Sequence, residues 1–177
     1  MPRLHVVDPA KAEGVVKELF EGPLKGKHLN IFKGLANSPA ALQAYLGMAQ
    51  ALSRAKLTKK EQEVIQLAIA EAQGCHYCVA AHTQVGRGAG LTEDQLIGAR
   101  RGSITDDPRL NALAKFVLAV HEKRGYVSDE ELAELRKHGY GDAEVAEIVA
   151  SYALMIFTST FNHVNDTEVD FPEPPAI

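Results

Sequence analysis

Residues 58–83 are TKKEQEVIQLAIAEAQGCHYCVAAHT, and the predicted fold class rests on this stretch. It opens on Thr58-x-x-Glu61, in which a hydroxyl and a carboxylate three residues apart can cap the free amides of a helix's first turn. The apolar residues after it recur at the spacing of a helix face rather than of a strand. Gly74 is expected to end this helix, and a second helix should follow from about Cys75.

The rest of the chain repeats such signals, and no segment shows the apolar alternation of a strand. Capping side chains, or a proline one residue later, predict helices opening near Asp8, Ser38, Thr92, Asp107, Ser128 and Asp142. The first should run to about Phe20 and the last to about His163, with a loop over residues 22–30. We therefore predict a single all-α domain, residues 1–177, of about seven to eight helices.

Composition and charge exclude several classes of function. The 177 residues are 46% hydrophobic and 24% charged, which suits one ordinary globular core. The net charge is -4 and the basic residues are scattered, so no nucleic-acid-binding surface is expected. No apolar stretch reaches the length of about 20 residues that a membrane span needs, and the N-terminus lacks a signal peptide's apolar run. We expect a cytoplasmic protein that binds neither nucleic acid nor membrane.

The last predicted helix is apolar nearly all round between Ile148 and Phe161. Such a helix has no face to give to solvent, so it should lie in the core, at a subunit contact, or both, and a homo-oligomer is expected. At its end, Asn162 and His163 suit a structural role, since a histidine favours the negative end of a helix dipole. The acidic, proline-rich residues 165–177 cannot continue the helix and should form an extended arm.

Two cysteines three residues apart stand at the start of the second helix of the quoted stretch. Cys75, Cys78 and His82 occupy positions i, i+3 and i+7, so they should share one face of that helix. Residues three apart on a helix have Cα atoms about 5–6 Å apart, which a disulfide tolerates, so the bond could open and close without refolding. The spacing favours redox reactivity over structural stability.

A reactive thiol needs a lowered pKa, because a free thiol with a pKa of about 8.5 is largely protonated at neutral pH. The thiol pKa could be lowered by the positive end of the helix dipole near Cys75, by the CxxC spacing and by the imidazole of His82. His82 in turn needs a partner for its own charge. Glu63 is the best candidate, because it shares the inward stripe of the preceding helix with Leu67 and Ala70, where a bare carboxylate is costly.

These residues form the pattern E-x11-C-x-x-C-x3-H in the setting EVIQLAIAEAQGCHYCVAAHT, which is far more specific than a bare CxxC. Over residues 38–105 the sequence resembles the core of the carboxymuconolactone decarboxylase and alkylhydroperoxidase D superfamily, in its CxxC-containing, peroxidase-related branch. The remainder resembles it only in helical character. The resemblance implies an all-α, alkylhydroperoxidase D-like fold that assembles into trimers or hexamers.

The resemblance also implies an activity, the reduction of hydroperoxides by the cysteine pair in an antioxidant, peroxiredoxin-type reaction. The second cysteine of the motif would be peroxidatic and the first resolving, which places these roles on Cys78 and Cys75. His82 and Glu63 would form the proton relay that activates the thiol. A lipoylated or thioredoxin-like protein would supply the external dithiol reductant, and no bound cofactor is expected. Lactone decarboxylation is disfavoured, because the decarboxylase branch typically lacks the cysteine pair.

One position departs from the family pattern. The best-known alkylhydroperoxidase D has a second histidine directly before its second cysteine, where this chain has Tyr77. A phenol with a pKa of about 10 can donate a hydrogen bond but is a poor base, so this part of the relay is expected to be weaker. Tyr77 is a candidate for lining the substrate entrance. His76 lies about 100° round the helix from that position and is expected to be peripheral.

Other interpretations of the motif stay open. Cys75, Cys78 and His82 could be three ligands of a zinc ion, with a fourth from Glu63, His76 or His163. A non-catalytic redox sensor, or a general dithiol–disulfide oxidoreductase, would use the same cysteines. The structural alternatives are two buried apolar cysteines, a hydrogen-bonded core histidine and an exposed helix glutamate.

Overall fold

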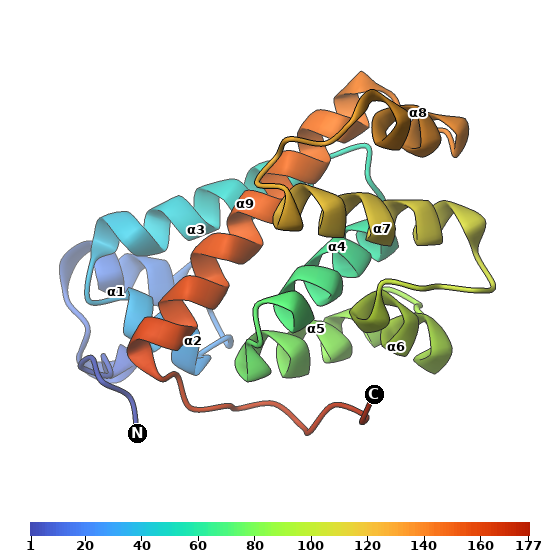
Figure 1. The fold of residues 1–177 in the computed structure, drawn as a ribbon. Coiled ribbons are helices and arrows are strands. Elements are labelled where there is room, and N and C mark those ends of the chain that lie inside the picture. The colour runs from blue at the N-terminus through green and yellow to red at the C-terminus, as the bar shows by residue number, and fades with distance from the viewer.

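The computed structural model describes all residues, 1–177, and its regular elements are all helical (Figure 1). The all-α prediction is confirmed, but there are nine α-helices rather than seven to eight. The elements are a 3-10 turn, η1 (Pro9–Lys11), and the helices α1 (Gly14–Glu21), α2 (Asn30–Leu35), α3 (Pro39–Leu52), α4 (Lys59–Ala72), α5 (His76–Gly88), α6 (Glu93–Arg101), α7 (Pro108–Glu122), α8 (Asp129–Lys137) and α9 (Asp142–Asn165).

Helix α4 is the centre of the fold and packs against α5, α6, α7 and α9. Its residues from Val64 to Ala70 are buried on every side. The predicted capping box is present, because the Thr58 hydroxyl accepts from the Glu61 amide and the Glu61 carboxylate accepts from the Thr58 amide. The helix starts predicted from Ser38, Thr92, Asp107 and Ser128 are also confirmed, each with its side chain on an amide of the first turn.

The N-terminal region differs from the prediction in two places. The helix predicted from Asp8 to Phe20 is split into η1 and α1, because Ala12 and Glu13 have extended backbones. Helix α2 was missed, since the sequence before it carries no capping side chain. Its first amide, at Asn30, is instead capped by the carboxylate of Asp170 at 2.7 Å, from the other end of the chain.

Helix α9 crosses the molecule diagonally between α3 and α4 (Figure 1). Its N-cap is Gly141 and not the predicted Asp142, which is the first helical residue. The helix is long and apolar enough to meet the length and composition criteria of a membrane span, which a core helix also meets. One side of it is buried, while Val149 and Val164 on the other side are exposed, and the homo-oligomer stays a prediction.

The C-terminal arm, residues 166–177, leaves the end of α9 and runs past α5 and α6 (Figure 1). It is extended as predicted and is held at both ends. The side-chain amide of Asn30 donates to the carbonyl of Glu168, and the guanidinium of Arg100 donates to the carbonyl of Pro175. Between these anchors, the ring of Phe171 meets Tyr77 edge-on with 5.5 Å between centroids. The arm therefore covers one end of α5.

Candidate active site

The two cysteines stand at the start of α5, where the N-cap geometry holds them. Cys75 is the N-cap residue, and its Sγ accepts a hydrogen bond of 3.3 Å from the amide of Cys78. The two sulfurs are bonded as a disulfide with a Cα–Cα distance of 5.2 Å, inside the predicted range. A sulfur at this place lies in the positive field of the helix N-terminus, which favours a thiolate once the disulfide is reduced.

The predicted pairing of Glu63 with His82 is confirmed. Glu63, on α4, is 1% exposed, and its Oε2 lies 2.7 Å from Nδ1 of His82 on α5. Its other oxygen forms an ion pair of 2.7 Å with Nζ of Lys59, one turn earlier on α4, a partner that the sequence interpretation did not name. Burial alone would raise the pKa of Glu63, but the charges and hydrogen bonds of His82 and Lys59 outweigh it and lower that pKa.

The ionised state of Glu63 determines which nitrogen of the His82 ring carries the proton. An ionised carboxylate only accepts hydrogen bonds, so Nδ1 of His82 carries the proton that it donates to Glu63. Nε2 is then the basic nitrogen, and no protein group bonds to it. The His82 side chain is 25% exposed and lines a cavity together with Cys78, one helical turn before it. A carboxylate–imidazole pair thus presents a free basic nitrogen to the space beside Cys78.

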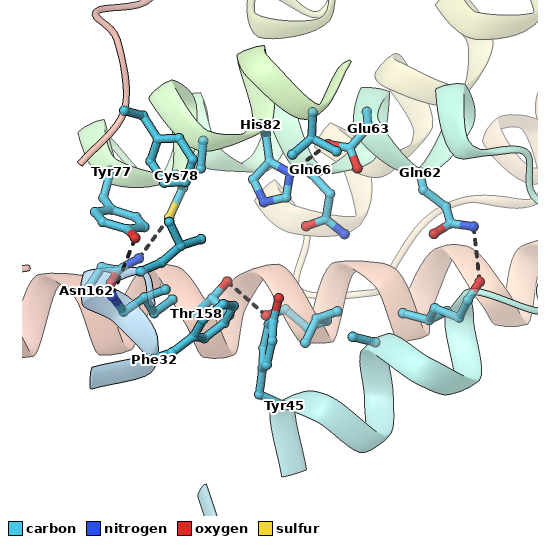
Figure 2. A pocket seen from close by; sticks show the side chains of 18 of the residues that line it. Phe32, Tyr45, Gln62, Glu63, Gln66, Tyr77, Cys78, His82, Thr158 and Asn162 are labelled. Carbon is cyan, nitrogen blue, oxygen red and sulfur yellow. Dashed lines mark hydrogen bonds and ion pairs between the residues drawn. The ribbon is translucent and has the colours of Figure 1, made fainter. Parts of the chain in front are cut away.

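The cavity has a volume of about 190 Å³ and is enclosed by α2, α3, α4, α5, α9 and the arm. Most of its polar groups come from α4 and α5, and Figure 2 shows His82, Glu63 and Cys78 on that side. Helix α9 adds Thr158 and Asn162. The facing walls are largely apolar and are formed by Leu29, Ile31, Phe32, Tyr45, Ala49, Leu52, Leu154 and Phe171. The site therefore combines a disulfide sulfur, a carboxylate–imidazole pair and an apolar lining.

Cys75 does not line this cavity. It borders a separate depression at the base of the C-terminal arm, together with His76 and His163. Both histidines are exposed, so neither lies beside Glu63 and His82, and His76 is peripheral to the cavity as predicted. No group of three or more His, Cys, Asp or Glu side chains is arranged to hold a metal ion.

Tyr77 lines the cavity, as its place in the motif suggested. It is 5% exposed, and its hydroxyl accepts a hydrogen bond of 3.4 Å from the amide of Ile31 at the start of α2. Burial, and next the neighbouring carboxylate of Asp170, raise the pKa of Tyr77 far above its ordinary value. The phenol thus stays protonated and serves to join α5 to α2 and to the arm.

Asn162 of α9 is the site residue that the sequence interpretation missed. Its side-chain amide lies 3.4 Å from Sγ of Cys78 and 4.0 Å from Sγ of Cys75 (Figure 2). Its place near a helix end predicts a structural role instead. The available signal was periodicity, since Thr158, Asn162 and Asn165 recur at the spacing of one face of an otherwise apolar helix, and all three are buried.

Comparison with known proteins shows what the region around this site is similar to. The model of the carboxymuconolactone decarboxylase family matches residues 39–119, which include Glu63, both cysteines and His82. The match covers just under half of the chain, and over this region the sequence is similar to that family. A curated relative, the alkyl hydroperoxide reductase AhpD of Mycobacteroides abscessus, is 46% identical over 41 residues. That match spans 23% of this chain and 23% of the relative.

Solved structures of low sequence identity show that the fold is shared along the whole chain. An uncharacterized peroxidase-related protein from Ralstonia eutropha, described as an AhpD core, superposes with a TM-score of 0.84 at 24% identity, covering 96% of this chain and 92% of that one. The debrominase Bmp8, in complex with 2,3,4-tribromopyrrole, superposes with a TM-score of 0.76 at 17% identity, covering 96% and 94%. The alkylhydroperoxidase D-like fold is therefore established, and one of the structures that share it is described as a debrominase.

Proposed function

We propose that this protein is a two-cysteine thiol peroxidase that reduces hydroperoxides by oxidising Cys78 and Cys75 to a disulfide. One observation carries the proposal: Cys78 of the disulfide opens into a cavity that also holds the Glu63–His82 pair. The family match and the peroxidase-related relatives agree with this chemistry. The apolar walls favour an organic hydroperoxide over hydrogen peroxide, because they can desolvate an alkyl or aryl group.

The first half of the reaction consumes the peroxide. In the reduced protein, Nε2 of His82 takes the thiol proton of Cys78, and Glu63 supports the resulting imidazolium. The thiolate attacks the terminal oxygen of the hydroperoxide, an S–O bond forms, and the O–O bond breaks. The sulfur becomes a sulfenic acid, and the departing alkoxide takes the proton from His82 and leaves as an alcohol. Sulfur is oxidised by two electrons and the peroxide is reduced by two.

The second half restores the cysteines. The Cys75 thiol attacks the Cys78 sulfenic acid, the disulfide forms and water leaves. The Cα–Cα distance of 5.2 Å lets this happen without rearrangement of α5. An external dithiol, from a lipoylated or thioredoxin-like protein, then reduces the disulfide by exchange. We propose that this cycle runs in the cytoplasm, in a trimer or hexamer, without a bound cofactor.

The decisive experiment measures hydroperoxide consumption driven by dihydrolipoamide. Wild-type protein should turn over, Cys78→Ser should be inactive, and Cys75→Ser should consume one equivalent and retain a sulfenic acid on Cys78. His82→Ala should be about 100-fold slower at neutral pH. His76→Ala is the matched control, because it removes an exposed histidine from the same helix, and it should behave as wild type.

Three results would overturn the proposal. The first is a Cys78→Ser variant that still consumes peroxide. The second is a folded wild-type protein, with reducible cysteines, that consumes none. The third is turnover of 2,3,4-tribromopyrrole, or disulfide exchange with insulin, in a protein inert to hydroperoxides, which would assign the same cysteines to a debrominase or to a general dithiol–disulfide oxidoreductase.

A further inference from the structure

The two buried asparagines at the end of α9 differ in how their polar atoms are used. Both groups of the Asn165 side chain are satisfied, because Oδ1 accepts from the amide of Leu4 at 3.0 Å and Nδ2 donates to the hydroxyl of Thr167 at 2.9 Å. Asn162 donates to Sγ of Cys78 at 3.4 Å, but its Oδ1 is buried and has no hydrogen-bond partner. Asn165 therefore has a structural role, whereas Asn162 retains a free acceptor beside the sulfur.

The backbone fixes Asn162 in this position. The amide of Thr167 donates to the carbonyl of Asn162 at 3.1 Å, and Asp166 takes a left-handed conformation with φ 52°, so the helix end is closed by a capping turn. The Asn162 side chain is 4% exposed and lines both the cavity of Cys78 and the depression of Cys75. It stands between the two openings, against both sulfurs.

We infer that Asn162 is a catalytic residue of the proposed peroxidase, whose Nδ2 stabilises the Cys78 thiolate and whose Oδ1 accepts the hydroxyl of the bound hydroperoxide. The inference rests on the proposed function for its substrate. A hydrogen bond donated to sulfur favours the charged form of the thiol. A neutral amide provides it without burying a second charge next to a cysteine that is 3% exposed. Figure 2 shows Asn162 reaching Cys78 from a different side than His82.

The role of Oδ1 follows from where hydrogen stays during the reaction. The terminal oxygen of a hydroperoxide carries the hydroxyl hydrogen before the attack, and the same oxygen carries it in the sulfenic acid afterwards. Oδ1 can accept this hydrogen throughout, while the O–O bond breaks and the alkoxide takes its proton from His82. The acceptor therefore directs the terminal oxygen, rather than the alkyl-bearing one, toward sulfur. No proton or electron passes through Asn162.

The thiolate contact is tested without any peroxide. In a Cys75→Ser background, which leaves Cys78 as the single thiol, the rate of alkylation by iodoacetamide is measured against pH. Adding Asn162→Leu should raise the midpoint by about one pH unit, and the isosteric Asn162→Asp should raise it further by adding a negative charge. Asn165→Ala is the matched control for a structural role, and it should lower the melting temperature without moving the midpoint.

These variants leave the other titratable groups around the sulfurs unchanged. A shift in the midpoint of the alkylation curve therefore reports on Asn162. In the cavity they are His82, Glu63, Lys59, Tyr45 and Tyr77, and on the depression side they are the amino group of Met1, His76, His163, Asp166 and Glu168. An unchanged midpoint in both folded Asn162 variants would overturn the thiolate contact. Asn162→Asp preserves the shape of the side chain, so the test survives if Asn162→Leu fails to fold.

The acceptor is tested by single-turnover oxidation with cumene hydroperoxide, with each rate divided by the thiolate fraction from the alkylation curve. After this correction, Asn162→Leu should still be about ten-fold slower than its parent. Equal corrected rates would overturn the role of Oδ1. A protein that shows the pH shift but consumes no peroxide would overturn the proposed function while leaving the thiolate contact in place, so the two failures are distinguishable.

Discussion

The two sides of the Cys78 sulfur are built in different ways. On one side, α4 and α5 supply Glu63 and His82, which lie within 20 residues of each other and carry the charges of the site. On the other side, α9 and the arm supply Asn162 and Phe171, which are neutral and distant in sequence from Cys78. The proposed acid–base chemistry is thus local to one helical hairpin, whereas the shape around the sulfur depends on the packing of remote segments.

The largest expected effect comes from neutralising the charged side. Glu63→Gln keeps the size of the side chain but cannot support an imidazolium on His82, so single-turnover oxidation of Cys78 at pH 7 should slow about 100-fold. This exceeds the effect of about ten-fold expected for Asn162→Leu. Glu71→Gln is the control, because Glu71 lies on the same helix as Glu63 but pairs with Arg100 of α6, outside the cavity. Equal losses in the two glutamine variants would show that the Glu63 effect is not specific to the site.

The next test concerns how the ionisation of Glu63 makes the free energy of unfolding depend on pH. Because the pKa of Glu63 is lowered in the folded protein, its ionisation stabilises the fold above the unfolded carboxyl's pKa of about 4.3, and this contribution is lost as pH falls through the lower folded value. The free energy of unfolding should therefore decrease as pH falls below the unfolded carboxyl's pKa of about 4.3, and Glu63→Gln should weaken that dependence.

Urea unfolding at several pH values measures this dependence. Glu61→Gln should flatten the same curve, because burial would raise the pKa of Glu61 but hydrogen bonds from Thr58 and Arg109 lower it. Glu61 does not line the cavity, so its variant should leave Cys78 alkylation unchanged. A Glu63→Gln curve that runs parallel to wild type would contradict the ion pair.

The neutral side should respond in substrate affinity rather than in rate. Phe171→Ala removes the aromatic contact with Tyr77 and opens one wall of the cavity, so KM for cumene hydroperoxide should rise about five-fold, with little change for hydrogen peroxide. Val169→Ala, an exposed change in the same arm, is the control. A matching rise for both peroxides would place the effect of the arm on the reactive groups instead of on the walls.

The smallest effect on the reaction rate is expected at Tyr77, where α5 contacts the arm. Its raised pKa keeps the phenol protonated, so Tyr77→Phe should change the peroxide reduction rate by less than about two-fold. The lost hydrogen bond to the Ile31 amide should lower the free energy of unfolding by about 1 kcal/mol. Thermal unfolding and steady-state kinetics on one preparation measure both, and a ten-fold loss of activity would assign the phenol a proton-transfer role.

Much of the helical hairpin was predictable because its signals lie within a few residues. The Thr58–Glu61 capping box and the placement of Cys78 and His82 one turn apart on α5 follow from helix geometry alone. Cys75 is the N-cap residue and lies outside that stripe. Helix α2 was not predictable, because its cap comes from Asp170, 140 residues away. The break at Ala12 and Glu13 did have a local signal, because Gly14 directly follows it and takes a φ of 53°, which favours glycine.

The sequence by itself determined which residues share a helix face, and hence that Cys78 and His82 lie together beside the inward Glu63. The period of the α-helix settles such neighbours whatever the rest of the chain does. Only the tertiary structure decided that Asn162 touches the sulfurs, that the arm closes the cavity, and that Cys78 rather than Cys75 opens into it. Those contacts join segments that meet only when α9 packs across α4 and α5, and helix periodicity does not encode that crossing.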